Sequence, residues 1–135
     1  MTMFRALIVD DDRDLRELIA LRLGQLDVEV AQAANGQKAL KALCEASAEE
    51  QPFGVILLDV AMPVIDGWQV LEALKANPLW QNTPIIMVTG IATSAEEITR
   101  MSNYGVLYTD KGSDCVQFVS SMVGRLMEEQ PSEVG

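Results

Sequence analysis

The regular alternation of short apolar runs with longer helical segments constrains the fold of this chain most. Five runs are rich enough in branched or apolar residues to form strands: 5–9, 28–33, 55–58, 85–88 and 106–108. A segment with helical periodicity follows each run. Strands that alternate with helices are parallel, and right-handed crossovers then place helices on both faces of the sheet. We therefore predict a doubly wound α/β fold with a five-stranded parallel sheet and five helices.

Apolar residues at helical spacing define the expected helices, and the first stripe contains Leu15, Leu18, Ile19 and Leu23. A more polar helix is expected over 95–102. The other three expected helices have the apolar stripes Ala39, Leu40 and Leu43; Val70, Leu71 and Leu74; and Val116, Val119, Met122, Val123 and Leu126. The residues after 127 are polar and include Pro131. We expect one domain over 1–127 and a flexible tail over 128–135, with no output domain attached.

Composition argues against several classes of function. The chain has 135 residues, enough for one domain with a substantial core, and 49% of them are hydrophobic. A formal net charge of -10 disfavours binding to nucleic acid and to anionic membranes. No stretch is apolar enough for a membrane span or a signal peptide, so we expect a cytoplasmic protein.

The sequence contains no histidine, which removes the commonest general base and the commonest ligand of transition metals. Cys44 and Cys115 lie far apart and outside any C-x-x-C motif, so neither a disulfide framework nor a zinc site is expected. Both are expected to pack on helix faces. Any chemistry must therefore use carboxylates, hydroxyls and lysine.

Candidate residues for that chemistry gather where the predicted strands end. Ligand sites of open parallel sheets form beyond the carboxyl ends of the strands, and the residues there are Asp10, Asp11, Asp59, Thr89 and Lys111. Two carboxylates about 4 Å apart repel by roughly 4 kcal/mol at an effective dielectric of about 20, so they need caps, protons or a cation. Asp12 has a simpler role, because aspartate is a preferred N-cap and a helix begins near Arg13.

Four motifs occur in one order and at consistent spacing: LIVDDDRDLREL, VILLDVAMPVIDGWQVLEALK, PIIMVTG and YTDK. Together they resemble the receiver domains of bacterial two-component response regulators, across the chain to about Leu126. The resemblance implies a flavodoxin-like sheet of strand order 2-1-3-4-5. It also implies a single-domain response regulator that takes a phosphoryl group from a histidine kinase or a histidine phosphotransfer protein. Such a protein catalyses only its own phosphorylation and dephosphorylation, and it signals by altering a protein-binding face.

The same resemblance assigns roles to individual residues. Asp59 is the implied phosphoacceptor, and Lys111 and Thr89 are the implied ligands of the phosphoryl oxygens. Asp10, Asp11 and Asp59, together with the backbone carbonyl of Ala61, are the implied ligands of Mg²⁺. This hard cation suits carboxylates and phosphate, and it would relieve the repulsion among the acids.

Further residues are implied to switch or to flank the phosphoryl group. Thr89 and Tyr108 are the implied switch, and the face formed by the fourth helix, the fifth strand and the fifth helix would report it to a downstream protein target. For Tyr108, an ordinary packing role is equally open. Gly90 leaves room for the phosphoryl group. Ala61 and Ile91 flank it and cannot position a water, which predicts slow hydrolysis of the acyl phosphate.

Two residues depart from the family pattern. Most members have proline after the lysine, often through a cis peptide, whereas this chain has Gly112, so a cis bond is not expected. Asp110 stands where an apolar residue is usual, and its charge would either orient the Lys111 ammonium or draw it away.

These departures keep a second function open, a receiver-like interaction module that docks without being phosphorylated. A third candidate is a dehalogenase-like hydrolase with an aspartyl nucleophile. Such a hydrolase needs a second acid two residues after the nucleophile, and Ala61 occupies that position.

Overall fold

The computed structural model of the protein describes residues 3–90, 93–112 and 114–129. Its five strands are β1 (Arg5–Val9), β2 (Glu29–Ala33), β3 (Val55–Asp59), β4 (Ile85–Thr89) and β5 (Leu107–Asp110). They form one parallel sheet in the order β2-β1-β3-β4-β5. The predicted doubly wound fold and its strand order are confirmed.

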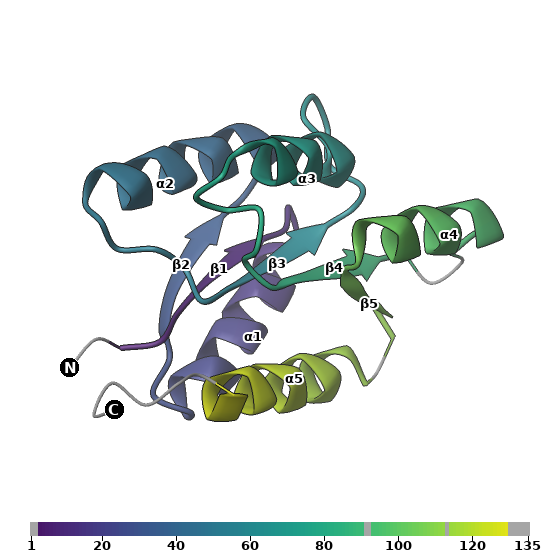
Figure 1. Cartoon of the computed structure of the whole chain (residues 1–135). Coiled ribbons are helices and arrows are strands. Elements are labelled where there is room, and N and C mark those ends of the chain that lie inside the picture. Colours follow the sequence, from purple (N-terminus) through teal and green to yellow (C-terminus); the bar gives the residue numbers. More distant parts are fainter. Residues whose placement is uncertain (1–2, 91–92, 113, 130–135) are drawn as a thin grey trace.

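The helices are α1 (Arg13–Gly24), α2 (Gly36–Ala48), α3 (Gly67–Ala76), α4 (Ala95–Tyr104) and α5 (Cys115–Glu129). Helices α2 and α3 cover one face of the sheet, α1 and α5 cover the other, and α4 lies beside the β5 edge (Figure 1). Helix α5 continues to Glu129, so Glu128 and Glu129 are helical and do not belong to the predicted tail. The remaining tail residues, 130–135, lie outside the described residues.

Three strands extend beyond the apolar runs that predicted them. Asp59 pairs with Val88, and Thr89 pairs with Asp110. Polar residues therefore continue the backbone ladder at the carboxyl ends of β3, β4 and β5, because parallel pairing depends on backbone groups and not on side-chain polarity. Asp59 and Thr89 are consequently fixed within the sheet. Lys111 is the residue directly after β5.

Alternate strand residues supply two hydrophobic cores, one on each face of the sheet. Leu7, Ile56 and Met87 belong to the core under α2 and α3. Ile8 and Leu57 belong to the core over α1 and α5. The central strands β1, β3 and β4 are buried on both faces, as parallel strands covered by helices must be. Their rigidity fixes the positions of the residues that follow them.

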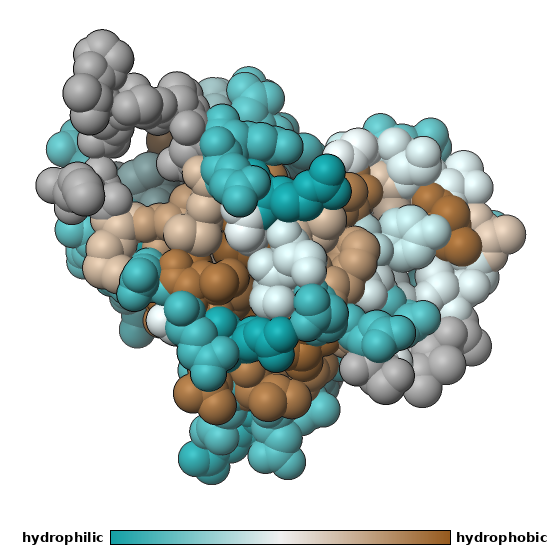
Figure 2. Space-filling view, turned by 90° about the horizontal axis from the view of Figure 1, so that it is seen from below, coloured by the Kyte–Doolittle hydropathy of each residue, from teal (hydrophilic) through white to brown (hydrophobic). Residues whose placement is uncertain are grey.

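Some predicted packing residues are exposed. Leu18 of α1 is 52% exposed, although Ile19 and Leu23 of the same stripe are buried. Figure 2 views the side on which α1 and α5 lie, and there hydrophobic residues reach the surface between hydrophilic ones. Cys115 is buried as predicted, but Cys44 is exposed, because it faces outward from α2. No helix among the described ranges is long and apolar enough to cross a membrane.

Helix N-caps determine where the loops at the carboxyl ends of the strands stop and the helices begin. Asp12 caps α1, as predicted, because its side chain accepts a hydrogen bond from the backbone N–H of Leu15. Asp66 and Gln69 form a capping box at the start of α3. Gly67 follows, and a Cβ there would lie 2.2 Å from the backbone oxygen of Asp59. Only glycine therefore allows α3 to begin this close to the end of β3.

Val64, in the loop between β3 and α3, has an unfavourable backbone conformation. Its φ of 70° is rare for a β-branched residue, and the Ile65 N–H donates to the Pro63 carbonyl across it. Because the side chain is 82% exposed, little packing would be lost by replacing it. We expect Val64→Asn to raise the free energy of unfolding by about 1 kcal/mol, since asparagine tolerates positive φ. Urea unfolding measures this change.

Val64→Thr is the matched control, because threonine is also β-branched and keeps the strain. We expect it to be no more stable than the parent protein. Equal stabilisation by asparagine and threonine would show that the backbone conformation is not the cause.

Candidate functional site

Three carboxylates meet at the carboxyl ends of two neighbouring strands. Asp10 follows β1, Asp59 ends β3, and each of the acids Asp10, Asp11 and Asp59 offers an oxygen within 4.8 Å of the others. Asp10 and Asp59 are buried, whereas Asp11 is exposed. The sequence predicted this cluster, and the structure brings all three predicted acids together.

Backbone and side-chain donors hold Asp10 in place. Its Oδ1 accepts a hydrogen bond from the Asp12 N–H at 2.8 Å, and its own N–H donates to the Ala33 carbonyl at 3.1 Å. Arg16 donates from Nη1 to the Asp10 backbone oxygen at 2.8 Å. The sequence does not indicate this contact of Arg16, because no motif marks an arginine one turn into a helix as a ligand of a strand end.

Lys111 completes the cluster from the far end of the chain. Its Nζ lies 3.0 Å from Asp10 Oδ1, with a hydrogen bond, and 3.3 Å from Asp59 Oδ2. Burial lowers the pKa of Lys111, but the hydrogen bond to Asp10 and the charges of both acids outweigh it and raise the pKa above its ordinary value. The ammonium is therefore charged and paired at neutral pH.

Asp59 remains short of favourable partners in spite of this lysine. The Ala61 N–H donates to Oδ1 at 3.4 Å, but Oδ2 is buried and accepts no hydrogen bond among the described residues. Burial and the charge of Asp10 raise the pKa of Asp59 to about 7, against the opposing effects of Lys111 and the Ala61 N–H. One lysine does not compensate two buried carboxylates, and the donor set of three acids suits a hard divalent cation.

The remaining predicted residues lie around this cluster. Thr89 is buried, and its Oγ1 lies 2.6 Å from Oγ1 of Thr93, a partner that the sequence did not indicate. A Cβ at Gly90 would meet nothing within 4 Å, so there is open space beside this residue. Tyr108 is 41% exposed on β5, and Ile91 lies outside the described residues.

Among the described residues, the Asp110 carboxylate forms no direct ion pair with the Lys111 ammonium. Among the described residues, the acids within ion-pair distance of Lys111 are Asp10 and Asp59. Asp110 Oδ1 instead accepts a hydrogen bond from the Gly112 N–H at 2.8 Å. No cis peptide occurs in the described parts of the chain, as expected for the Lys111–Gly112 bond.

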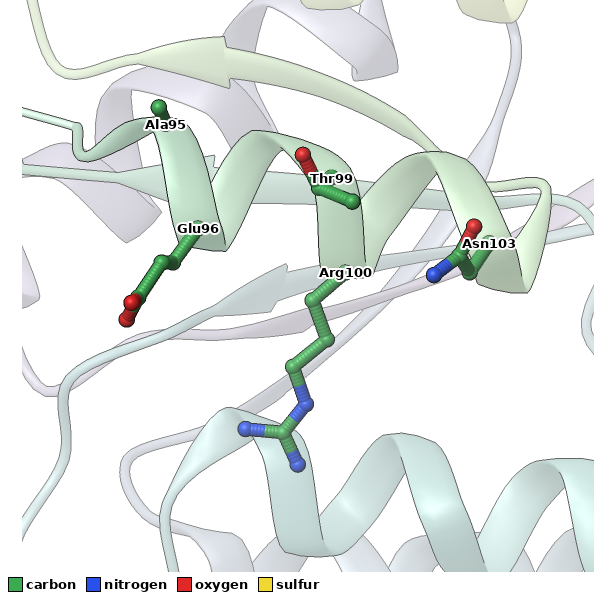
Figure 3. A pocket seen from close by; sticks show the side chains of 5 residues that line it. All are labelled: Ala95, Glu96, Thr99, Arg100 and Asn103. Carbon is green, nitrogen blue, oxygen red and sulfur yellow. The ribbon is translucent and has the colours of Figure 1, made fainter.

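A separate hollow of about 390 Å³ lies on α4, away from the acids, and its lining residues are Ala95, Glu96, Thr99, Arg100 and Asn103. Figure 3 shows the Arg100 side chain leaving α4 toward a neighbouring helix. Its guanidinium lies 4.1 Å from the ring centre of Trp68, and Nη2 lies 3.5 Å from Glu72 Oε1. Met101 is the one fully buried side chain of α4, so this helix has fewer buried side chains than the other four helices.

Comparison with known proteins identifies the family. A model of the response regulator receiver domain matches residues 6–119. The chain is a member of the response regulator receiver domain family. Receiver domains are signalling domains of two-component systems, as the four motifs predicted, and they generally bind Mg²⁺ at an acidic cluster such as Asp10, Asp11 and Asp59.

Similar proteins include two transcriptional regulators. The Staphylococcus aureus transcriptional regulatory protein SrrA is 36% identical over 98 residues, which are 73% of this chain and 36% of SrrA. The probable transcriptional regulator ycf27 of Cyanidium caldarium is 34% identical over 93 residues, which are 69% of this chain and 34% of that protein. The receiver domain described here thus spans about a third of the length of these relatives.

Solved receiver structures share the fold over their full length. The chemotaxis response regulator CheY4 of Vibrio cholerae is 29% identical, with a TM-score of 0.76 over 93% of this chain and 99% of that chain. The phosphorylated cyanobacterial phytochrome response regulator RcpA is 21% identical, with a TM-score of 0.84 over 96% of this chain and 98% of that chain. The RcpA likeness concerns the fold alone.

Proposed function

We propose that this receiver domain accepts a phosphoryl group on Asp59 from a phosphohistidine of a histidine kinase or phosphotransfer protein. The observation that carries the proposal is the buried Asp59 Oδ2, which has no hydrogen-bond donor among the described residues and lies 3.3 Å from the Lys111 ammonium. A new O–P bond forms on this carboxylate while the P–N bond to the donor imidazole breaks, and the leaving nitrogen takes the electron pair. Catalysis is then mainly positioning and electrostatic stabilisation.

A divalent cation fits the remaining acids. Asp10, Asp11 and Asp59 would hold Mg²⁺ together with the backbone carbonyl of Ala61, and the ion would supply positive charge where phosphoryl charge develops. The exposed Asp11 gives the ion a route to the two buried acids. Lys111 would bind phosphoryl oxygens, and the open space beside Gly90 leaves room for them.

Thr89 and Tyr108 would report the modification. Thr89 must exchange its 2.6 Å contact with Thr93 for a phosphoryl oxygen, which alters the segment that leads into α4. Met101 is the one buried side chain of that helix, so the positions of α4 with and without the phosphoryl group can be close in free energy. Ile98, Leu107 and Tyr108 expose apolar surface on α4 and β5, and we propose that a downstream protein target binds the α4–β5–α5 face.

We propose a cytoplasmic location, where histidine kinases act.

The test is incubation of the protein with acetyl phosphate and Mg²⁺, followed by intact mass measurement. We expect a phosphoryl adduct in the parent protein and none in Asp59→Asn, which lacks the nucleophilic carboxylate but keeps the shape of the side chain. Asp114→Asn is the matched control, because Asp114 is an exposed aspartate outside the cluster, and this variant should still form the adduct. An equal adduct in Asp59→Asn would reject Asp59 as the acceptor.

The unphosphorylated docking module gives a different result in the same samples. Mg²⁺ should raise the melting temperature of a phosphoacceptor site, because a ligand that binds only the folded state stabilises that state. Absence of both the adduct and the shift in melting temperature would support the docking module.

A further inference from the structure

The turn between β5 and α5 is closed by a side chain. Asp110 is the last residue of β5, and its Oδ1 accepts a hydrogen bond from the Gly112 N–H at 2.8 Å. An aspartate that binds the backbone two residues later forms a turn with the intervening residue at its centre. That intervening residue is Lys111.

Gly112 has no side chain and so leaves room for the Asp110 carboxylate. A Cβ at position 112 would lie 2.7 Å from Asp110 Oδ1, closer than real Cβ contacts occur. Gly105 is the one glycine of the described ranges with a positive φ, so Gly112 is not required for a left-handed backbone. A side chain at this position would displace the flexible end of the exposed Asp110 side chain, so its hydrogen bond to the Gly112 N–H would be lost.

The backbone of Lys111 is held on both sides of this turn. Its N–H donates to the Thr89 carbonyl at 3.0 Å, which ties it to the end of β4. The Gly112 carbonyl accepts a hydrogen bond from the Cys115 N–H at 3.1 Å, which ties the turn to the start of α5. A lysine has four flexible side-chain torsions, so the direction of its ammonium depends on how firmly its backbone is held.

We propose that Asp110 and Gly112 are a matched pair of positioning residues that direct Lys111 toward the phosphoryl group. The proposal rests on the phosphoacceptor function proposed above. The pair acts through the hydrogen bond and not through the charge of Asp110, because that carboxylate is exposed and lies outside ion-pair distance of Lys111. An uncharged acceptor of the same shape should therefore serve equally well.

The test compares Asp110→Ala, Asp110→Asn, Gly112→Ala and the double variant Asp110→Ala/Gly112→Ala. Calorimetric titration measures two affinities separately, for Mg²⁺ alone and for beryllofluoride, a phosphoryl mimic, at saturating Mg²⁺. We expect Asp110→Ala and Gly112→Ala each to weaken beryllofluoride binding about five- to tenfold, and Asp110→Asn to bind as the parent does. The double variant should bind like Asp110→Ala, because the clash at position 112 needs the Asp110 carboxylate.

Mg²⁺ affinity separates positioning from general damage. The Lys111 ammonium competes with a cation for Asp10 and Asp59, so a less firmly directed Lys111 should leave Mg²⁺ affinity unchanged or higher. A site that is merely unfolded or distorted would lose affinity for both ligands, and that outcome would contradict the proposal.

Other outcomes also overturn it. Parent-like beryllofluoride binding in Asp110→Ala, weak binding in Asp110→Asn, or additive losses in the double variant would each show that the pair does not position Lys111. If the parent protein binds Mg²⁺ but no beryllofluoride, the phosphoacceptor function fails, and this proposal fails with it. Tight binding by the parent and by all four variants rejects the positioning role alone.

Discussion

Replacing Lys111 by methionine is expected to lower the free energy of unfolding of the metal-free protein by about 3 kcal/mol at pH 8. The ammonium lies 3.0 Å from Asp10 Oδ1 and 3.3 Å from Asp59 Oδ2, and both acids are buried. Methionine keeps most of the length of the side chain but leaves two buried carboxylates uncompensated, and this loss exceeds the value of the ion pairs themselves. Urea unfolding in the presence of a chelator measures the change.

Two conditions should reduce the loss in Lys111→Met. Saturating Mg²⁺ should reduce it, because a cation on the three acids replaces the missing charge. A pH near 5 should reduce it as well, because Asp59 is then protonated. Lys41→Met, at an exposed lysine of α2, is the control and should change the stability by less than about 0.5 kcal/mol. A loss that is equal at pH 5 and pH 8 would show that charge compensation is not the role of Lys111.

The sequence was sufficient to predict the architecture and the convergence of the site. Periodicity predicts five strands and five helices because a buried parallel strand has a continuous apolar run, and a helix that covers a sheet has an apolar stripe. The candidate residues Asp10, Asp59 and Lys111 were predicted from position alone, since the carboxyl ends of parallel strands share one edge. Their distances in the structure agree with that expectation.

Other features depend on tertiary contacts that carry no sequence pattern. Leu18 fits the apolar stripe of its helix, yet it is exposed while Ile19 and Leu23 of the same stripe are buried. The Thr93 partner of Thr89 and the hydrogen bond from Gly112 to Asp110 arise from loop conformation. Local composition marks such segments as loops and does not say which side chain closes them.

The pKa of Asp59 predicts how the stability of the metal-free protein depends on pH. This pKa is about 7 in the folded protein and 3.8 for an unperturbed aspartate, so the folded state keeps a proton that the unfolded chain releases. The contribution of Asp59 to stability is therefore complete below pH 4 and is lost as the pH rises to about 7, by at most about 4 kcal/mol. The raised pKa of Lys111 adds no opposing change in this range, because that group stays charged in both states.

The variant Asp59→Asn isolates this effect, since asparagine stays neutral at every pH. Without metal, it should match the parent protein near pH 4 and exceed it in stability by pH 8, as shown by urea unfolding across that range. Attraction to Lys111 does not reverse the sign, because the net pKa of Asp59 is raised with that attraction included. Saturating Mg²⁺ should remove the advantage, because the cation favours the ionised carboxylate. A difference between the two proteins that stays constant from pH 4 to pH 8 would show that Asp59 ionises normally and that the cluster does not need a cation.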